Sequence, residues 1–343
     1  MHSILHFPIY LASFFLPALH FLRKITVGTL GEVCEKFIAE KRGMGLRCDT
    51  ESKQMSALCR FSLDYNLEPG TLSESFVRDW IAKKTHETES NRHSRYRATR
   101  QLAQYMKRMG YSAFCPEKED VAKYTTTFAP YIFTHDEMHR LIAAADSVKN
   151  SKFSSSPHYH FIMPAVLRTL YCCGLRVSEA LNLLVSDVDF DNDILTIRES
   201  NQDKSRYVPM SKELSGKLAE YSVLKPSSDW FFPAPDGGFY TPRSVYDFFR
   251  RTLSRAGISH GGRGKGPRVH DLRHTFAVHS LQRFVALGCD VTAFLPKLSA
   301  YLGHDTMRYT EPYVRMTAEV YPEISELLQQ KYGDLIPQTE VLM

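Results

Sequence analysis

The sequence has little of what marks disulfide-rich, zinc-binding or disordered proteins. Its seven cysteines, an odd number in 343 residues, include no Cys-x-x-Cys pair. This excludes an evident disulfide framework or cysteine-based zinc site, and it favours a reducing compartment, for which we expect the cytoplasm. Internal repeats and low-complexity tracts are also lacking. With 43% hydrophobic and 24% charged residues, the composition predicts a folded globular protein.

Charged residues are absent from positions 1–22, where the run from Ile4 to Leu22 is rich in Phe, Leu and Ile. A membrane span or a secretory signal therefore has to be considered. Pro8 and Pro17 interrupt the run, and no basic residue precedes it, as a secretory signal would require. We expect residues 1–27 to be a docking segment or an upstream extension of the true start, and a membrane association is not favoured.

The excess of positive charge lies in the first third of the chain. The net charge is +5, and residues 1–130 hold 19 basic against 14 acidic side chains, whereas the remainder holds 24 of each. Between Arg78 and Arg108 the ratio is nine to three. Such a run is either a solvated helix face or a surface that contacts phosphates along a duplex. The asymmetry hints at a polyanionic partner for this part of the chain.

Apolar residues at helical spacing predict a first, helical domain over residues 28–115. Its four helices are expected from about Leu30, from Met55 to Leu63, from Ser73 to Lys84 and from Ser94 to Met109. Residues 116–130 have the composition of a linker.

A second domain is expected over residues 131–330, followed by a tail over 331–343. Thr134 is placed to cap its first helix. A strongly apolar helical stretch follows, interrupted at Gly174, and then three short strands are predicted at 188–190, 194–197 and 207–210. Helical patterns return after the strands. The predicted fold class is mainly α with a small antiparallel β-sheet.

An arginine stands in an apolar setting just after the glycine break. Arg176 follows Gly174 by two residues and precedes Glu179 by three. Because an arginine among apolar neighbours is costly unless it is paired, an ion pair with Glu179 is the structural interpretation. The functional one is a phosphate-binding arginine held in place by that glutamate.

A second motif pairs a histidine with an arginine. His270 and Arg273 lie side by side on a helix, so they can present a proton-transfer group and a bidentate cation to one oxyanion. His270 and His274, four apart, would also fit half of a metal site. No glutamate occupies the metalloprotease position and no third ligand is evident, so we expect no metal.

The last motif is Leu302-Gly303-His304, with Tyr313 nine residues after the histidine. Thr310 is expected to cap the helix that bears Tyr313. Pro312 then falls in the first turn of that helix, where its missing N–H is not needed.

Taken in order, these motifs resemble the signature of the tyrosine recombinase, or phage integrase, family: Arg, then His-x-x-Arg, then Leu-Gly-His and a tyrosine nine positions later. The resemblance covers roughly residues 30 to 330. It implies an N-terminal SAM-like helical core-binding domain and a recombinase catalytic domain. It also implies a site-specific recombinase that cleaves and rejoins DNA through a 3′-phosphotyrosyl intermediate, for integration, excision or transposition of a mobile element. No cofactor is implied.

The resemblance implies a role for each catalytic candidate. Tyr313 would attack phosphorus, while Arg176 and Arg273 clamp the non-bridging oxygens. His304 would donate a further hydrogen bond to these oxygens, and His270 would act as acid or base towards the tyrosine. Tyr301 and Tyr309, the neighbouring tyrosines, are expected to be packing residues.

The sequence departs from the family pattern at the lysine that family members carry in the hairpin between their second and third strands. The corresponding position holds Asn201, and Lys204 lies three residues later. We expect Lys204 to protonate the leaving 5′ oxygen; the alternative is a weakened general acid.

The implied partners are double-stranded DNA recombination sites and other copies of the chain in a homotetramer. The tail after Glu323 would dock on a neighbouring protomer through Ile324, Leu327 and Leu328. Whether accessory recombinases take part stays open. No small additional arm-binding domain is recognisable, which favours a simple or transposon-type enzyme. The basic residues expected to contact DNA are Arg92, Arg95, Arg97, Arg100, Arg206, Arg263, Lys265 and Arg268.

Two rival functions share much of this pattern. A DNA-binding protein that kept the fold and lost catalysis would explain Asn201 at the lysine position. A type IB topoisomerase would use the same chemistry to relax supercoils without strand exchange.

Overall fold

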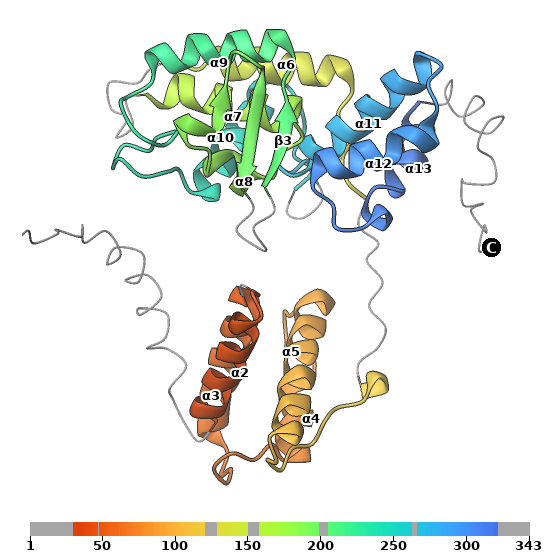
Figure 1. The fold of residues 1–343 in the computed structure, drawn as a ribbon. Helices are drawn as coiled ribbons and strands as arrows, with labels where there is room; N and C mark the ends of the chain where they lie inside the picture. Colours follow the sequence, from red (N-terminus) through yellow and green to blue (C-terminus); the bar gives the residue numbers. More distant parts are fainter. Residues whose placement is uncertain are drawn as a thin grey trace, which may run out of the picture. The chain divides into compact units, whose positions relative to one another are not determined.

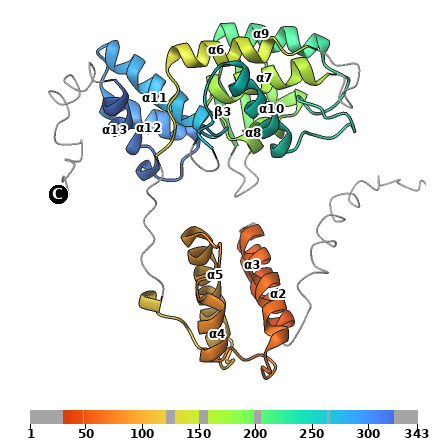
Figure 2. The same ribbon diagram turned by 180° about the vertical axis from the view of Figure 1, so that it is seen from behind.

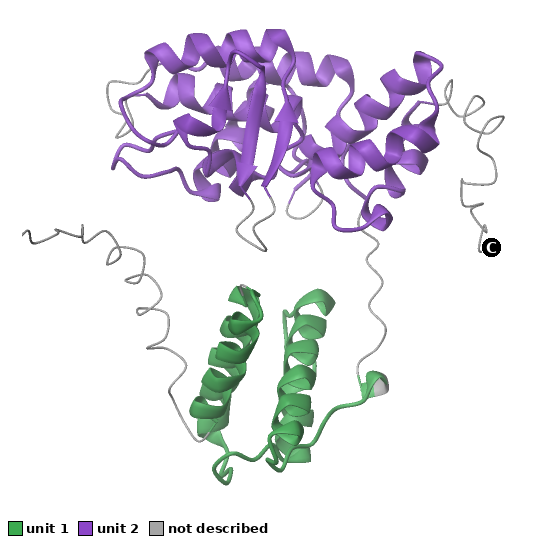
Figure 3. Ribbon diagram, in the orientation of Figure 1, with its two compact units in different colours: residues 1–127 green, residues 128–343 purple. Residues whose placement is uncertain are grey.

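The structure is a computed structural model that describes residues 30–46, 48–120, 129–149, 158–198, 205–262 and 266–321. The chain forms two compact units, residues 1–127 and 128–343 (Figure 3). Each unit buries its own set of hydrophobic residues. Residues 1–29, which include the apolar start, lie outside the described part. In the described ranges, no helix combines the length and hydrophobicity needed to cross a membrane.

The described part of the first unit is helical, as predicted. Thr88 caps the longest of its helices, because its hydroxyl accepts a hydrogen bond from the Asn91 N–H, and the helix therefore begins earlier than Ser94. In the core, the Trp80 indole N–H donates to the Thr99 hydroxyl at 2.9 Å, which satisfies both buried groups. The helices are α2 (Gly31–Gly43), α3 (Asp49–Phe61), α4 (Glu74–Ile81) and α5 (Glu89–Arg108).

The second unit is mainly helical with one small antiparallel sheet, which confirms the predicted fold class. Figures 1 and 2 both show α11, α12 and α13 gathered at one end of this unit. Its elements are α6 (His135–Asp146), α7 (Tyr159–Cys172), α8 (Val177–Leu181), β1 (Val188–Asp189), β2 (Ile194–Arg198), β3 (Ser205–Pro209), α9 (Lys212–Leu224), α10 (Pro242–Arg255), α11 (Asp271–Ala286), α12 (Val291–Leu302) and α13 (Pro312–Val320).

The second unit opens with the cap expected at Thr134. Its hydroxyl accepts a hydrogen bond from the Glu137 N–H at 3.1 Å, and the Glu137 carboxylate accepts one from the Thr134 N–H at 2.9 Å. This reciprocal capping box fixes the start of α6 and confirms the prediction.

The sheet has the order β1-β2-β3, and all its pairs are antiparallel. Leu195 and Ile197 of β2 and Val208 of β3 point into the core, as the period-2 pattern requires. Ile197 pairs with Arg206, which places this arginine on the strand that contacts α12. Residues 199–204, between β2 and β3, lie outside the described part, and they include Asn201 and Lys204.

The predicted break at Gly174 separates α7 from α8. Gly174 has φ +59°, in the left-handed region, and a Cβ atom there would lie 2.4 Å from Cδ1 of Phe276. Only glycine combines this backbone conformation with so close an approach of a ring. The break brings the Gly174 carbonyl within hydrogen-bonding distance of Arg273, in the first turn of α11.

We expect Gly174→Ala to lower the free energy of unfolding by about 1–3 kcal/mol, because it adds backbone strain and a clash with Phe276. Gly216 is the matched control: it lies inside α9 with no atom within 4 Å of a Cβ position. Gly216→Ala should raise the free energy of unfolding by about 0.5–1 kcal/mol. Urea unfolding of both variants tests this, and equal effects would contradict the proposed cause.

Candidate active site

Two arginines that are far apart in the sequence are fixed by backbone carbonyls in one place. Arg273, on α11, is 2% exposed and donates hydrogen bonds to the carbonyls of Gly174, at 2.8 Å, and of Leu302. Arg176, at the start of α8, donates to the Gly303 carbonyl at 3.1 Å. The Gly174 break and the turn after α12 therefore hold both guanidinium groups in position.

Glu179 is the anion at the centre of this arrangement. It accepts hydrogen bonds from Arg176 at 2.7 Å and from Arg206 at 2.9 Å, and its carboxylate lies 3.8 Å from the Arg273 guanidinium. The ion pair predicted between Arg176 and Glu179 is confirmed. Burial alone would raise the pKa of Glu179, but hydrogen bonds and charge from Arg206 and Arg176 hold that pKa below its usual range.

Among the described residues, three guanidinium groups share one carboxylate, so these four side chains together carry a net charge of +2. We call Arg176, Arg206, Arg273 and Glu179 the arginine cluster. Burial, followed by the charge of Arg176, lowers the pKa of Arg273 to about 10, so its guanidinium still carries a proton at neutral pH. A cluster with surplus positive charge, made of planar donors that can form paired hydrogen bonds, is suited to a phosphate or another oxyanion.

The Leu-Gly-His turn follows from the left-handed conformation of Gly303, whose φ is +66° at the C-terminus of α12. The next residue, His304, pairs its Nδ1 with the Thr310 hydroxyl at 2.8 Å. Thr310 was expected to cap the helix of Tyr313, and this prediction is wrong. Glu311 occupies the N-cap position without a side-chain cap, because the Thr310 hydroxyl is directed to His304.

Pro312 lies in the first turn of α13, as predicted.

Tyr313 lies in α13 and is 3% exposed. Its hydroxyl is 3.0 Å from Nδ1 of His274, one residue beyond Arg273 on α11. Burial raises the pKa of Tyr313, and the charges of Arg273 and Arg176 offset only part of this effect. The phenol is therefore protonated at neutral pH, and it needs a proton acceptor before it can act as a nucleophile.

Two more histidines belong to this site. The ring of His304 lies nearly parallel to that of Tyr313, with centroids 6.3 Å apart. His270 is exposed at the surface, although neighbouring protein atoms still desolvate part of its ring, and His304 is half-buried. Desolvation, followed by the charges of Arg273 and Arg176, lowers the pKa of both His270 and His304 to about 4. Both rings are neutral at pH 7 before an anion arrives.

The two tyrosines near Tyr313 differ in environment. Tyr301 stacks on Phe276, with centroids 5.4 Å apart, and its hydroxyl donates to the Pro209 carbonyl, so the prediction of a packing residue is confirmed. The same prediction for Tyr309 is wrong, because its side chain is 65% exposed. The turn before α13 directs Tyr309 outwards.

The arginines expected to contact DNA from the first unit have different environments. Arg95 is buried and pairs with Glu87, so it cannot present its guanidinium to a duplex and this expectation needs correction. Arg92 donates to the Ile81 carbonyl and Arg100 to the Pro116 carbonyl, and both are partly buried. Arg97 is exposed on α5. The sequence pattern did not separate exposed from buried members of this basic helix.

The basic residues of the second unit that were expected to contact DNA also differ in their exposure. Arg206 belongs to the arginine cluster, with its side chain 13% exposed, rather than to an outer surface. Arg268 is exposed and lies 3.8 Å from the Asp271 carboxylate. Arg263, Lys265 and Lys204 lie outside the described residues.

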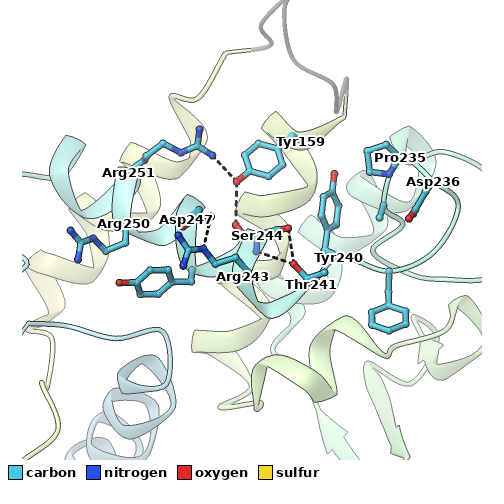
Figure 4. Close-up of a pocket in the computed structure, with 13 residues that line it drawn as sticks. Tyr159, Pro235, Asp236, Tyr240, Thr241, Arg243, Ser244, Asp247, Arg250 and Arg251 are labelled. Carbon is cyan, nitrogen blue, oxygen red and sulfur yellow. Dashed lines mark hydrogen bonds and ion pairs between the residues drawn. The ribbon is translucent and has the colours of Figure 1, made fainter. Parts of the chain in front are cut away.

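A depression of about 1100 Å³ lies elsewhere on the second unit, along α10 (Figure 4). Arg251 donates to the Tyr159 hydroxyl at 2.7 Å, and Arg243 pairs with Asp247 at 2.9 Å. No member of the predicted catalytic set lines it. In the parts of the chain that the structure describes, no group of three or more His, Cys, Asp or Glu could hold a metal ion.

We expect Glu179→Gln to lower the free energy of unfolding by about 3 kcal/mol, because it leaves guanidinium groups without their buried counter-charge. Glu220→Gln is the matched control: Glu220 pairs with Lys217 on an exposed face of α9, and its loss should cost less than about 1 kcal/mol. Chemical denaturation measures both values. Similar small losses would show that the arginine cluster does not depend on this anion.

Known proteins share both the sequence and the fold of this chain. The model of the phage integrase family matches residues 132–319. The y4rB protein of Sinorhizobium fredii, named among integrases and recombinases, is 25% identical over 317 residues, which cover 90% of this chain and 99% of that protein. A tyrosine recombinase of Pseudothermotoga lettingae is 32% identical over 182 residues, covering 52% of this chain and 57% of the relative.

Among solved structures, the integrase of the Tn1549 transposon, in complex with circular intermediate DNA, has a TM-score of 0.58 at 18% identity. The match covers 82% of this chain and 94% of the integrase, and it shows a shared fold. Because the family model spans more than half of the sequence and includes the arginine cluster and Tyr313, the chain belongs to the phage integrase family and is a tyrosine-type site-specific recombinase.

Proposed function

We propose that the chain cleaves and rejoins double-stranded DNA at recombination sites through a 3′-phosphotyrosyl bond to Tyr313. The observation that carries this proposal is the placement of a buried tyrosine hydroxyl in the field of Arg273 and Arg176, two arginines held by backbone carbonyls. A phosphodiester would bring a further anion to the guanidinium groups of Arg273 and Arg176. A covalent link to the tyrosine conserves the bond energy, so that the strand can be rejoined to another partner.

The arginines have the role of stabilising the charge that grows on the two non-bridging oxygens during attack. Arg176 is the more accessible of the two, with 40% of its side chain exposed, so it can meet an incoming phosphate first. Arg273 is buried and fixed before binding. Preorganised donors of this kind are worth about 3–4 kcal/mol each, so the loss of either arginine should slow cleavage several hundredfold or more.

The histidines complete the site. His304 has its Nδ1 engaged by Thr310, which orients the ring and leaves Nε2 for the phosphate oxygens. His270 precedes α11 and lies near enough to Arg273 and Arg176 to feel their charge. We assign it a proton-transfer role in the reaction. Lys204, in the segment after β2, is assigned as the general acid for the leaving 5′ oxygen.

Contacts to the DNA backbone are proposed for exposed basic residues of both units. Arg97 and Arg268 are exposed, and Arg263 and Lys265 belong to the same basic segment as Arg268. The arginines along α10 provide a further basic surface (Figure 4). These contacts would position the duplex without reading its sequence.

We further propose that the chain acts on a mobile element, as a homotetramer on paired sites. The Tn1549 integrase, which shares the fold, is a transposon enzyme bound to a circular intermediate DNA. The residues expected to join neighbouring protomers, Ile324, Leu327 and Leu328, lie outside the described part of the chain. The SAM-like class of the first unit also remains a proposal, which its helical content supports.

Tyr313→Phe should abolish covalent attachment to DNA while leaving binding intact. The substrates are nicked duplexes built on the sequence that the Tyr313→Phe protein selects from a random pool. Wild-type protein should give an adduct that survives denaturing electrophoresis. Tyr309→Phe is the matched control, because Tyr309 is exposed, and it should form the adduct at the wild-type rate.

Two results would favour the rival functions. A wild-type protein that binds the selected duplex but never forms an adduct would be a DNA-binding protein without catalysis. Relaxation of supercoiled plasmids that lack the selected sequence, with no strand exchange, would indicate a topoisomerase.

Lys204→Ala should slow adduct formation about 10²- to 10⁴-fold on an ordinary phosphodiester, because the 5′ oxygen would leave without its proton. On a duplex whose scissile 5′ oxygen is replaced by sulfur, the rate should recover, since a thiolate leaves without protonation. Lys212→Ala is the control, because Lys212 is largely exposed after β3. If Lys204→Ala is as fast as the control on the ordinary duplex, the general acid is another group.

A further inference from the structure

We propose that His274, in place of His270, is the group that takes the proton directly from Tyr313 as the tyrosine attacks DNA. This inference rests on the proposed function of Tyr313 as the nucleophile. The sequence motifs indicate no catalytic role for His274. Its spacing from His270 suggested only half of a metal site. In the structure, Nδ1 of His274 faces the Tyr313 hydroxyl, which must lose its proton during attack.

The geometry of this pair carries the proposal. Nδ1 of His274 is 3.0 Å from the Tyr313 hydroxyl oxygen, within the range of a direct hydrogen bond. The two ring centroids are 5.7 Å apart. His270, the histidine of the family signature, packs edge-on against the His274 ring, with centroids 4.9 Å apart. His274 thus combines contact with the hydroxyl and contact with the signature histidine.

The surroundings of His274 keep its ring in the neutral form, which is the form that can accept a proton. Burial is the largest effect that lowers its pKa, to about 4, and the charged or titratable groups facing it act in the same direction: His270, Arg273, Arg268 and His304. The ring is therefore neutral at pH 7 and has one nitrogen with a free lone pair. When that nitrogen is Nδ1, the Tyr313 hydroxyl donates its hydrogen to it.

The step balances without any further reactant. As the bond from the Tyr313 oxygen to phosphorus forms, the phenolic proton passes to Nδ1 of His274, and the bond from phosphorus to the 5′ oxygen breaks. The leaving oxygen takes a proton from the general acid, assigned above to Lys204. The resulting imidazolium is tolerated beside Arg273 because the bound phosphate brings negative charge into the site. On rejoining, His274 returns the proton to the tyrosine oxygen.

Helix α11 offers a matched control for a buried histidine–tyrosine pair. His279, five residues after His274, places its Nδ1 2.8 Å from the Tyr171 hydroxyl. It is also buried, and desolvation and His135 lower its pKa to about 4. Tyr171 belongs to α7 and is no candidate nucleophile. His279→Ala therefore removes the same kind of interaction from the same helix without touching Tyr313.

The test compares adduct formation by His274→Ala, His274→Asn and His279→Ala on the nicked duplexes described above. His274→Ala should be at least about a hundredfold slower than wild type. His274→Asn can keep a hydrogen bond to the hydroxyl but cannot take up a proton, so it should be slow as well. His279→Ala should react at close to the wild-type rate, and all three should bind the duplex with wild-type affinity.

Two further measurements separate proton transfer from mere positioning. The sulfur-substituted duplex should not restore His274→Ala, since it relieves only the leaving group. Raising the pH towards that at which tyrosine ionises should shrink the defect of both His274 variants, because the phenol then loses its proton to solvent.

Three results would overturn the proposal: a His274→Ala rate close to wild type, full activity of His274→Asn, or rescue of His274→Ala by the sulfur substrate. These outcomes are distinct from a failure of the proposed function, in which wild-type protein itself would form no adduct.

Discussion

Glu179 accepts hydrogen bonds from Arg176 and Arg206 and lies 3.8 Å from the Arg273 guanidinium, so one carboxylate orders three cations. Without this anion, three guanidinium groups would repel one another in a largely desolvated site. With it, the cluster keeps a surplus of positive charge. Glu179 therefore supplies a counter-charge that holds the three arginines together, and by itself it neutralises only one of them.

The same electrostatic balance sets the state of the remaining groups. Desolvation is the main cause that keeps His270, His274 and His304 neutral, and neighbouring charges act in the same direction, while burial keeps the Tyr313 phenol protonated. Neutral histidines and a protonated phenol are the protonation states expected before a phosphate binds. A bound phosphate would offset the positive field, stabilise a protonated histidine and thereby favour loss of the phenolic proton. Substrate binding and nucleophile activation are thus linked by charge in this account.

The fold also explains why the motifs are spaced as they are. Gly174 and Gly303 both adopt left-handed conformations, and each places a carbonyl where an arginine from another segment can donate to it. These two glycines therefore do more than end helices, because their carbonyls are the acceptors that orient the guanidinium groups. Pro312 starts α13 without costing a hydrogen bond and places Tyr313 in the first turn of that helix.

Much of this could be predicted from the sequence, because the relevant signals are local. Helical periodicity predicted the two helical regions. Thr134 before an apolar helix predicted the cap, Gly174 predicted the break, and the three-residue spacing of Arg176 and Glu179 predicted their ion pair. Contacts that depend on tertiary packing were missed. Arg206 joins Glu179 from 27 positions away, and His274 meets Tyr313 from 39 positions away.

Side-chain direction accounts for most of the wrong predictions. Thr310 lies one residue before the N-cap position, which Glu311 occupies, and the turn before α13 brings its hydroxyl to His304. Arg95 belongs to a basic helix, yet its position on the buried face of α5 pairs it with Glu87. Spacing along one helix cannot decide which face a partner element will cover, so these outcomes required the packed structure.

The most direct test of the central claim is to identify the residue that carries DNA in the covalent adduct. Wild-type protein trapped on the nicked duplex would be digested with protease and nuclease, and the nucleotide-bearing peptide sequenced by mass spectrometry. The account predicts a nucleotide joined through its 3′ phosphate to Tyr313, in the tryptic peptide of residues 309–315. A nucleotide on Tyr309 in the same peptide, or on any other residue, would contradict it.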